Sequence, residues 1–154
     1  VIINPANSRR LMSKGISRSI AEYAGGGIER DAKKIIEVRG CPFQLGEFYI
    51  TQSGRLKRRG VQQIYHAVIS DFPGGLISVD SISKSVKRIL LDAIKNGVKS
   101  IGIPAIGTGI YGLDTSIAAC SIIGIIRPFE HLININIVSE NDNFNKVIKK
   151  ILKN

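Results

Sequence analysis

The sequence predicts an α/β domain built from layers of helices and strands, and three observations carry this prediction. Short β-branched segments alternate along the chain with longer segments of helical period, as is typical of a layered α/β fold. A nearly continuous apolar segment, Lys99 to Pro104, indicates a strand buried on both faces. The chain has 154 residues, of which 44% are hydrophobic, and this is the size of one domain. We therefore expect a single domain over residues 1–154.

The N-terminal quarter is expected to contain one strand and two helices. Val1 to Ile3 is interpreted as the remnant of a strand, and Asn4 to Asn7 as the polar turn that follows it. Apolar residues at helical spacing predict short helices near residues 17–23 and 28–38, separated by the glycines of 25–27. Because the sequence opens on a strand, with neither a basic leader nor an initiator methionine, we expect one or more strands of the domain to precede Val1.

Two segments of alternating polarity, Glu47 to Gln52 and Gln63 to Val68, predict neighbouring strands. The loop between them carries a cluster of cations at Arg55 and at residues 57–59. Clustered cations bind polyanions such as RNA. A loop of this composition is equally well explained by simple solvation, since no aromatic residues alternate with the cations to stack bases.

The rest of the chain is expected to alternate helix and strand. The apolar periodicity and the cap residues place these elements, in order, over a helix at 80–96, the strand at 99–104, a helix beginning near Asp114 or Thr115, a strand at 132–138 and an amphipathic helix at 141–152.

The composition argues against a membrane protein, a disulfide-stabilised protein and a metal-binding protein. The longest apolar stretch, Ile117 to Ile126, is shorter than the roughly 20 residues that span a bilayer, so it predicts a buried helix and no membrane partner. Two distant cysteines, Cys41 and Cys120, fit buried free thiols in the reducing cytoplasm.

His66 lies within a predicted strand and is interpreted as a hydrogen-bonded core residue. No spacing of Cys, His, Asp and Glu suits a metal, so neither a metal nor a cofactor is expected, and the net charge of +10 favours anionic ligands of any kind.

The loop from Ala105 to Leu113 is the strongest candidate for a binding site. It holds Gly107, Gly109 and Gly112 between a strand and a helix, so backbone N–H groups can approach phosphate oxygens closely, and the helix N-terminus adds a favourable dipole. Open α/β sheets bind ligands at this end of their strands. The same spacing also suits a tight connection that binds nothing, and it matches neither the Walker A motif nor the dinucleotide fingerprint. We expect the loop to bind the phosphates of a nucleotide-like ligand.

Several segments together resemble the macro domain family, and the resemblance covers essentially the whole chain. The ending Gly109-Ile110-Tyr111-Gly112 is the most specific match. The matching segments are Ile2 to Asn7, similar to the family's Val-Asn-Ala-Ala-Asn turn, Gly15-Ile16 at the end of the first phosphate loop, Ile64 to Val68 as the strand with His and Val, and Ile103 to Gly112 as the second phosphate loop.

The resemblance implies a three-layer α/β/α fold with a mixed central sheet and a cleft for ADP-ribose. It implies that the diphosphate lies between the two loops, and that Asn7 and Tyr111 surround the distal ribose. The ligand-binding residues that it implies are Asn4, Asn7, Gly15, Ile16, Gly107, Thr108, Gly109, Ile110, Tyr111 and Gly112.

The first loop departs from the family pattern. Ser13 and Lys14 stand where the family usually has glycines, which compromises close backbone approach, although Lys14 adds a positive charge. Members that hydrolyse ADP-ribosyl esters often have an acidic residue after this loop or a histidine before it. This chain has Ser17 and Met12 there, and neither side chain is a general acid or base.

The adenine-reading position also departs from the family pattern. It corresponds to Ser139 in place of an aromatic residue, and the substitutes considered are Phe144, by stacking, and Asn141, by hydrogen bonding.

Three hypotheses for the function follow. The first is a module that binds ADP-ribose or an ADP-ribosylated protein through backbone N–H groups. The second is a hydrolase of ADP-ribose 1''-phosphate, or of O-acyl or protein ADP-ribosyl esters, in which Asn7 is the catalytic residue that orients a water. The third is binding of RNA or poly-ADP-ribose by the basic surface at Arg55 to Arg59. The sequence leaves open whether the chain is an enzyme.

Overall fold

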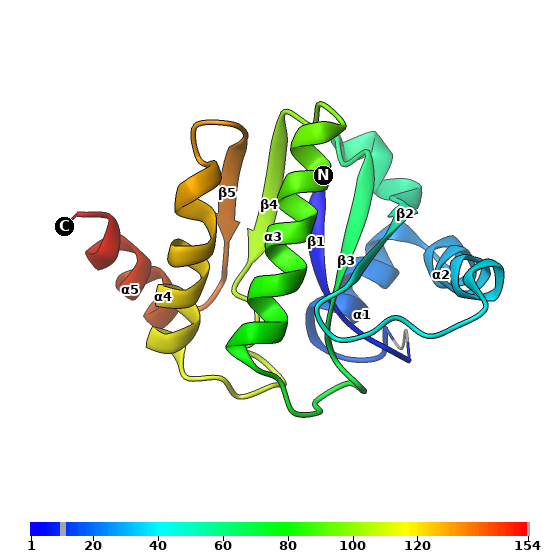
Figure 1. The fold of residues 1–154 in the computed structure, drawn as a ribbon, viewed down its shortest axis with the longest axis horizontal. Coiled ribbons are helices and arrows are strands. Elements are labelled where there is room, and N and C mark those ends of the chain that lie inside the picture. The colour runs from blue at the N-terminus through cyan, green and yellow to red at the C-terminus, as the bar shows by residue number, and fades with distance from the viewer. Residues whose placement is uncertain (10–11, 154) are drawn as a thin grey trace.

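The computed structural model describes residues 1–9 and 12–153, in which strands and helices alternate (Figure 1). The elements in chain order are β1 (Ile2–Asn7), α1 (Gly15–Ala24), α2 (Gly27–Arg39), β2 (Phe48–Gln52), η1 (Gly54–Arg59), β3 (Gln63–Ser70), α3 (Val79–Lys95), β4 (Ser100–Pro104), α4 (Thr115–Ile126), η2 (Arg127–Phe129), β5 (Asn134–Val138) and α5 (Asp142–Leu152).

The described strands form one mixed sheet with the order β2-β3-β1-β4-β5. Strand β1 lies in the middle and runs parallel to β3 on one side and to β4 on the other. Strand β5 continues the parallel half, whereas β2 pairs antiparallel with β3 at the opposite edge. The parallel strands β1, β3, β4 and β5 therefore end at the same edge of the sheet, where ligands of such sheets bind.

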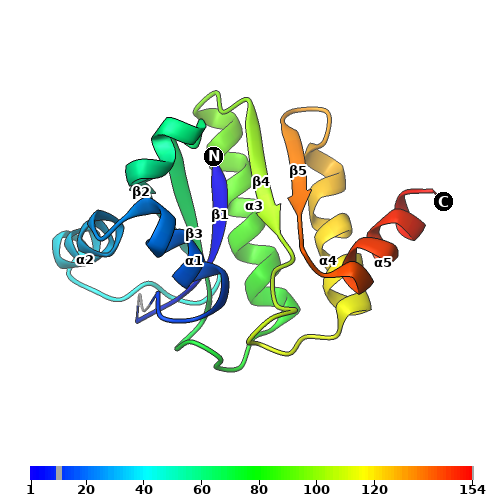
Figure 2. The same ribbon diagram turned by 180° about the vertical axis from the view of Figure 1, so that it is seen from behind.

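Helices cover both faces of the sheet, which confirms the predicted α/β/α fold. Alternate residues of β3 show the two faces: Tyr65 and Ile69 pack into the core that α3 and α4 close, whereas Ile64 packs against α1 and α2. In Figure 2 the helices α1 and α2 lie over β1, β2 and β3 and leave that face of β4 and β5 open.

Strand β4 is buried on one face only, contrary to the expectation of a strand buried on both. Ile101 and Ile103 are fully buried against α3 and α4, whereas Ser100 is exposed and Gly102 is partly exposed. The reason is the coverage of the second face, because α1 and α2 do not extend over β4.

The segment from Asn4 to Asn7, expected as a turn, is the second half of β1 and pairs with β3. Pro5 is tolerated inside this central strand for a geometric reason. Val1 accepts a hydrogen bond from the N–H of Gly102, and alternate residues of a strand face the same side, so the nitrogen of Pro5 faces β4. Pairing with β4 is confined to Ile2 and Gly102, so the missing N–H of Pro5 removes no ladder bond.

Two other expectations are corrected by the fold. Cys41 and Cys120 are free but exposed, not buried, since one follows the end of α2 and the other lies on the outer side of α4. The basic segment between β2 and β3 is the short helix η1 and not an open loop. None of the helices in the described part of the chain combines the length and the apolar character needed to span a membrane.

Candidate functional site

A cleft opens at the carboxyl ends of β1 and β4, where the two strands separate beyond their one pair, Ile2 and Gly102. We call its deeper part the inner pocket, with a cavity volume of about 130 Å³. It is lined by Pro5, Asn7, Lys14, Gly15, Ile16, Ser17, Pro73, Ala105, Gly107, Gly109, Ile110 and Tyr111. Lys14 is the one charged side chain among these lining residues, so the described lining of the pocket favours an anion.

A second cavity, which we call the helix groove, continues the cleft along α1. It shares Gly15, Ile16, Ala105 and Gly109 with the inner pocket, so the two cavities meet at the two glycine-containing loops. Its other lining residues are Ile2, Ser19, Ile20, Tyr23, Leu56, Pro104, Thr108, Val138, Ser139, Glu140 and Asn141. The groove lies where α1 and α2 leave β4 and β5 uncovered, so the two-sided coverage of the sheet shapes the site.

The helix N-terminus that faces the cleft with free N–H groups belongs to α1, not to α4 as the sequence suggested. Asp114 caps α4, because its carboxylate accepts from the amides of Ser116 (2.9 Å) and Ile117 (3.0 Å). The α1 N-cap, Lys14, makes no such side-chain bond. The first N–H groups of α1 therefore find no acceptor among the described residues and are oriented by the helix to bind an anion.

The loop after β4 supplies a second set of backbone donors. Four of its backbone N–H groups donate to carbonyls within the loop or at the end of β4: those of Ile106, Thr108, Gly112 and Leu113. The remaining amides of the loop find no carbonyl acceptor within the part of the chain that the structure describes: those of Ala105, Gly107, Gly109, Ile110 and Tyr111. A Cβ on Gly109 would meet nothing within 4 Å, so space for a ligand lies directly above that residue.

The two loops touch across the cleft. A Cβ built on Gly15 would lie 3.6 Å from Cγ2 of Ile110, which is an ordinary van der Waals contact, so the isoleucine side chain packs next to this glycine. Gly15 also has φ of 54°, the left-handed conformation that favours glycine. The retained glycine of the first loop is thus the one that the geometry requires, while Lys14 adopts an extended conformation open to any residue.

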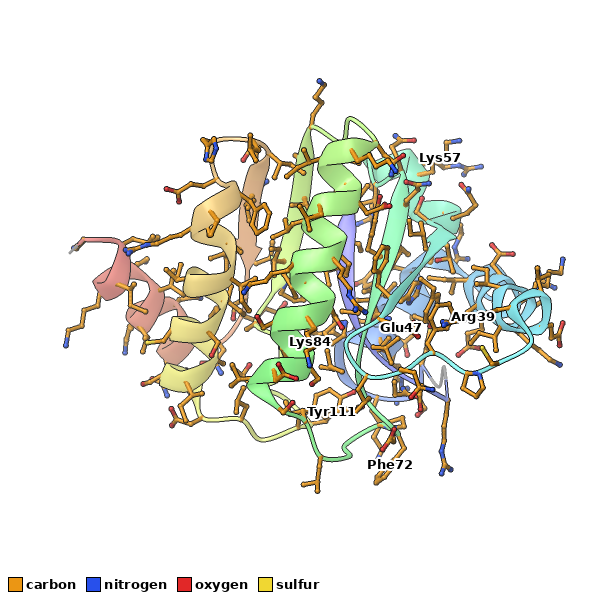
Figure 3. The ribbon with its side chains drawn as sticks, viewed as in Figure 1. Arg39, Glu47, Lys57, Phe72, Lys84 and Tyr111 are labelled. Carbon is orange, nitrogen blue, oxygen red and sulfur yellow. The ribbon has the colours of Figure 1, made fainter. Side chains whose placement is uncertain are left out.

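Tyr111 is held at the far end of the inner pocket by a hydrogen-bonded serine. Ser70, at the end of β3, donates to the carbonyl of Phe72 (3.0 Å), and its oxygen lies 3.2 Å from the Tyr111 hydroxyl. Tyr111 and Phe72 lie at the same end of the molecule in Figure 3, the end at which β1 and β3 finish. The tyrosine is therefore placed as a wall of the pocket.

Asn4 and His66 lie beneath the cleft in a buried polar cluster. Asn4 does not line either cavity, and its Nδ2 donates to Nδ1 of His66 (3.0 Å). Nε2 of His66 contacts Oγ1 of Thr51 at 2.8 Å, and the ring stacks on Tyr49 with centroids 4.4 Å apart. Complete burial lowers the pKa of His66 to about 3, so the ring is neutral and structural.

The helix groove contains two of the residues considered for the adenine-reading position. Ser139 and Asn141 line it, but the Asn141 side chain already accepts from the amide of Phe144 at the start of α5. Phe144 is fully buried in the core, so it does not stack on a ligand. The aromatic residue in the groove is Tyr23, 59% exposed, with the guanidinium of Arg59 over its ring at 5.7 Å. No sequence pattern pointed to Tyr23, because the position of its side chain depends on how α1 packs beside η1.

The inner pocket has few groups that could transfer protons. Its described lining residues include no Asp, Glu or His, and Met12 is buried in the core under α1. Asn7 lines the pocket and is almost completely buried. No group of His, Cys, Asp and Glu in residues 1–9 and 12–153 is arranged to hold a metal ion.

The fold and the cleft together define a class of protein: a three-layer α/β/α domain that presents two backbone loops to a ligand at the carboxyl ends of parallel strands. The chain belongs to the macro domain family, whose model, described as "Macro domain", matches residues 3–122.

The chain is also similar to individual proteins and solved structures. An uncharacterized protein of Aquifex aeolicus is 36% identical over 130 residues, which cover 84% of this chain and 74% of the relative. A variant of the Oceanobacillus iheyensis macrodomain, solved with ADPR, is similar with a TM-score of 0.84 at 21% identity, over 99% of this chain and 86% of that one. The Trypanosoma brucei macrodomain in complex with ADP-ribose has a TM-score of 0.78 at 27% identity, over 98% of this chain and 62% of that one.

Proposed function

We propose that this chain binds ADP-ribose, free or attached to a protein, in the cleft formed by the inner pocket and the helix groove. The observation that carries the proposal is the pair of facing backbone segments, the start of α1 and the loop at 105–113, each of which has several amides with no acceptor among the described residues. Two such segments, with Lys14 beside them, suit the oxygens of a diphosphate. The macrodomains solved with ADPR and with ADP-ribose support the same ligand.

The two cavities suggest how the ligand lies. The diphosphate spans Gly15, Ile16 and the loop from Gly107 to Ile110, where the cavities meet. The distal ribose enters the inner pocket beside Asn7 and Tyr111, and the adenosine enters the helix groove. Asn4 and Gly112 then act from outside the contact surface, Asn4 from beneath and Gly112 as a positive-φ turn residue that holds the loop.

Isothermal titration with ADP-ribose, and with ADP and AMP as controls, tests this proposal at two salt concentrations. Saturable binding of ADP-ribose, tighter than that of ADP, is the expected result, because only ADP-ribose fills the inner pocket. Equal binding of ADP and ADP-ribose would remove the distal-ribose site, and no binding of either would overturn the proposal.

A second function of the same cleft is hydrolysis of ADP-ribose 1''-phosphate or of an ADP-ribosyl ester. It is favoured by the placement of Asn7 in the inner pocket, where its amide could orient a water while the substrate's own phosphate assists. The test of this hydrolase function compares the rate of product release from these substrates by wild type with the rate by Asn7→Ala. Release at background level from both proteins would eliminate the enzymatic function.

A third function is binding of RNA or poly-ADP-ribose at the basic surface of η1. Tyr23 provides the exposed aromatic group that the spacing of the cations lacked, and it lies beside Arg59. Affinity that falls steeply with added salt and is lost in Arg58→Glu would support it.

The two free thiols fit a reducing compartment, and we propose that the protein acts in the cytoplasm.

A further inference from the structure

A buried row of four polar side chains connects the cleft to the far edge of the sheet. It runs from Ser17 in α1 to Asn4 in β1, His66 in β3 and Thr51 in β2, with contacts of 2.9, 3.0 and 2.8 Å. Every member is less than a tenth exposed. Polar groups so deeply buried persist only when their hydrogen bonds are made, so the geometry of each member depends on its neighbours.

The directions of these hydrogen bonds are coupled. The Asn4 amide nitrogen donates to Nδ1 of His66, so Nδ1 carries no proton. A neutral ring has one N–H, which is then on Nε2 and donates to the Thr51 hydroxyl. The other end of the Asn4 amide accepts from the Ser17 hydroxyl. We therefore expect a change at Thr51 to alter the orientation of the Asn4 amide and, through it, the hydrogen bond that Ser17 makes.

Ser17 also closes a gap that the cleft creates in the sheet. The carbonyl of Pro5 faces β4, like the Val1 carbonyl, but β4 has already separated from β1 at that level. The Ser17 hydroxyl also lies 2.8 Å from this carbonyl, so its one proton is shared between the Pro5 carbonyl and the Asn4 amide oxygen in a three-centre hydrogen bond. The first turn of α1 is thus attached to β1 at the point where the strands part.

We propose that the row Thr51–His66–Asn4–Ser17 is a positioning device that fixes the uncapped start of α1 for the diphosphate. The proposal rests on the ADP-ribose function proposed above. Lys14 supplies no side-chain cap and two glycines of the loop are replaced, so the attachment through Ser17 sets the direction of the amides at Gly15 and Ile16. Thr51 and His66 are positioning residues and touch no ligand.

The test uses Thr51→Val, which removes the far end of the row and nearly preserves the shape of the side chain. We expect ADP-ribose affinity to fall about fivefold, the factor that one typical buried hydrogen bond represents. Thr51→Ser, which keeps the hydroxyl, should restore affinity to within about twofold of wild type. The matched control is Ser85→Ala, since Ser85 is a buried helix serine that donates to the carbonyls of Glu47 and Val68, away from the cleft.

Two outcomes contradict the proposal: equal affinity for wild type and Thr51→Val, or equal weakening by Ser85→Ala. A ligand-free measurement separates it from the function itself. The amide NMR signals of residues 14–18 should move more in Thr51→Val than in Ser85→Ala, and unchanged signals would overturn the positioning role even if ADP-ribose binds. In wild type, ADP-ribose should also shift the ring nitrogen signals of His66, although the ring is buried.

Discussion

Replacing Gly109 with glutamate tests directly where the phosphates lie. The residue has an ordinary backbone conformation, and a Cβ there would meet nothing within 4 Å, so the folded chain accommodates the new side chain without strain. A bound diphosphate would lie against this position. The glutamate would then fill the phosphate site and place a negative charge beside the ligand.

The size of the effect follows from Coulomb's law. A carboxylate about 5 Å from a phosphate charge, at an effective dielectric constant of about 20, costs about 3 kcal/mol. This corresponds to a loss of affinity of about 100-fold. Gly109→Gln has the same bulk without the charge, so the difference between the two variants measures the electrostatic part, which should shrink at high salt.

Isothermal titration with ADP-ribose is the assay, and thermal unfolding confirms that each variant is folded. Gly124→Glu is the charge control, since Gly124 is an exposed position on α4 with open space around it. If Gly109→Glu binds ADP-ribose within about threefold of wild type, the phosphates do not lie at this loop.

Three further predictions follow from the geometry. Gly15→Ala should cost about 1 kcal/mol of unfolding free energy, because φ is 54°, and should weaken ADP-ribose binding severalfold; unchanged titration curves would contradict this. Gly107→Ala should cost roughly 2–4 kcal/mol in denaturant unfolding, because its Cβ would lie 3.0 Å from Leu113 and φ is 92°, whereas Gly109→Ala should be neutral. In the folded protein His66 has a pKa of about 3 and is neutral, whereas in the unfolded chain it takes up a proton below about pH 6.5. The free energy of unfolding should therefore decrease as the pH is lowered from about 6.5 to about 3, by up to about 1.4 kcal/mol per pH unit. His66→Gln should lack this slope, and an identical slope in both proteins would exclude His66 as its source.

The order of elements and the two loops could be predicted from the sequence, because each rests on local signals. The glycines of the loop after β4, the Asp114 cap and the apolar stripe of α3 all act within a few residues. The resemblance to the macro domain family was predicted from the two loops together with the segments Ile2 to Asn7 and Ile64 to Val68, and the family model confirms it.

What the sequence could not show depends on contacts between distant segments. The segment from Asn4 to Asn7 has the composition of a turn, but it is a strand because its backbone pairs with the distant β3. The side-chain partners of Asn4, His66 and Ser17, are likewise 62 and 13 residues away. The sequence predicts Asp114 as a helix start, but it does not show the effect of this residue on ligand binding. The Asp114 carboxylate accepts from the first amides of α4, so those amides are not available to a ligand. Tyr23 reaches the groove only through the packing of α1 beside η1.

The central position of β1 has a consequence for folding kinetics. Ile2 pairs with Ile64 and lies opposite Gly102, so both neighbours of the first strand come from far along the chain. Contacts of such high sequence separation slow the formation of a native sheet. The cleft cannot exist until β4 has joined β1, so we expect its two loops to meet late in folding, after the rate-limiting step. We therefore expect a ligand that bridges them to slow unfolding while leaving the refolding rate unchanged.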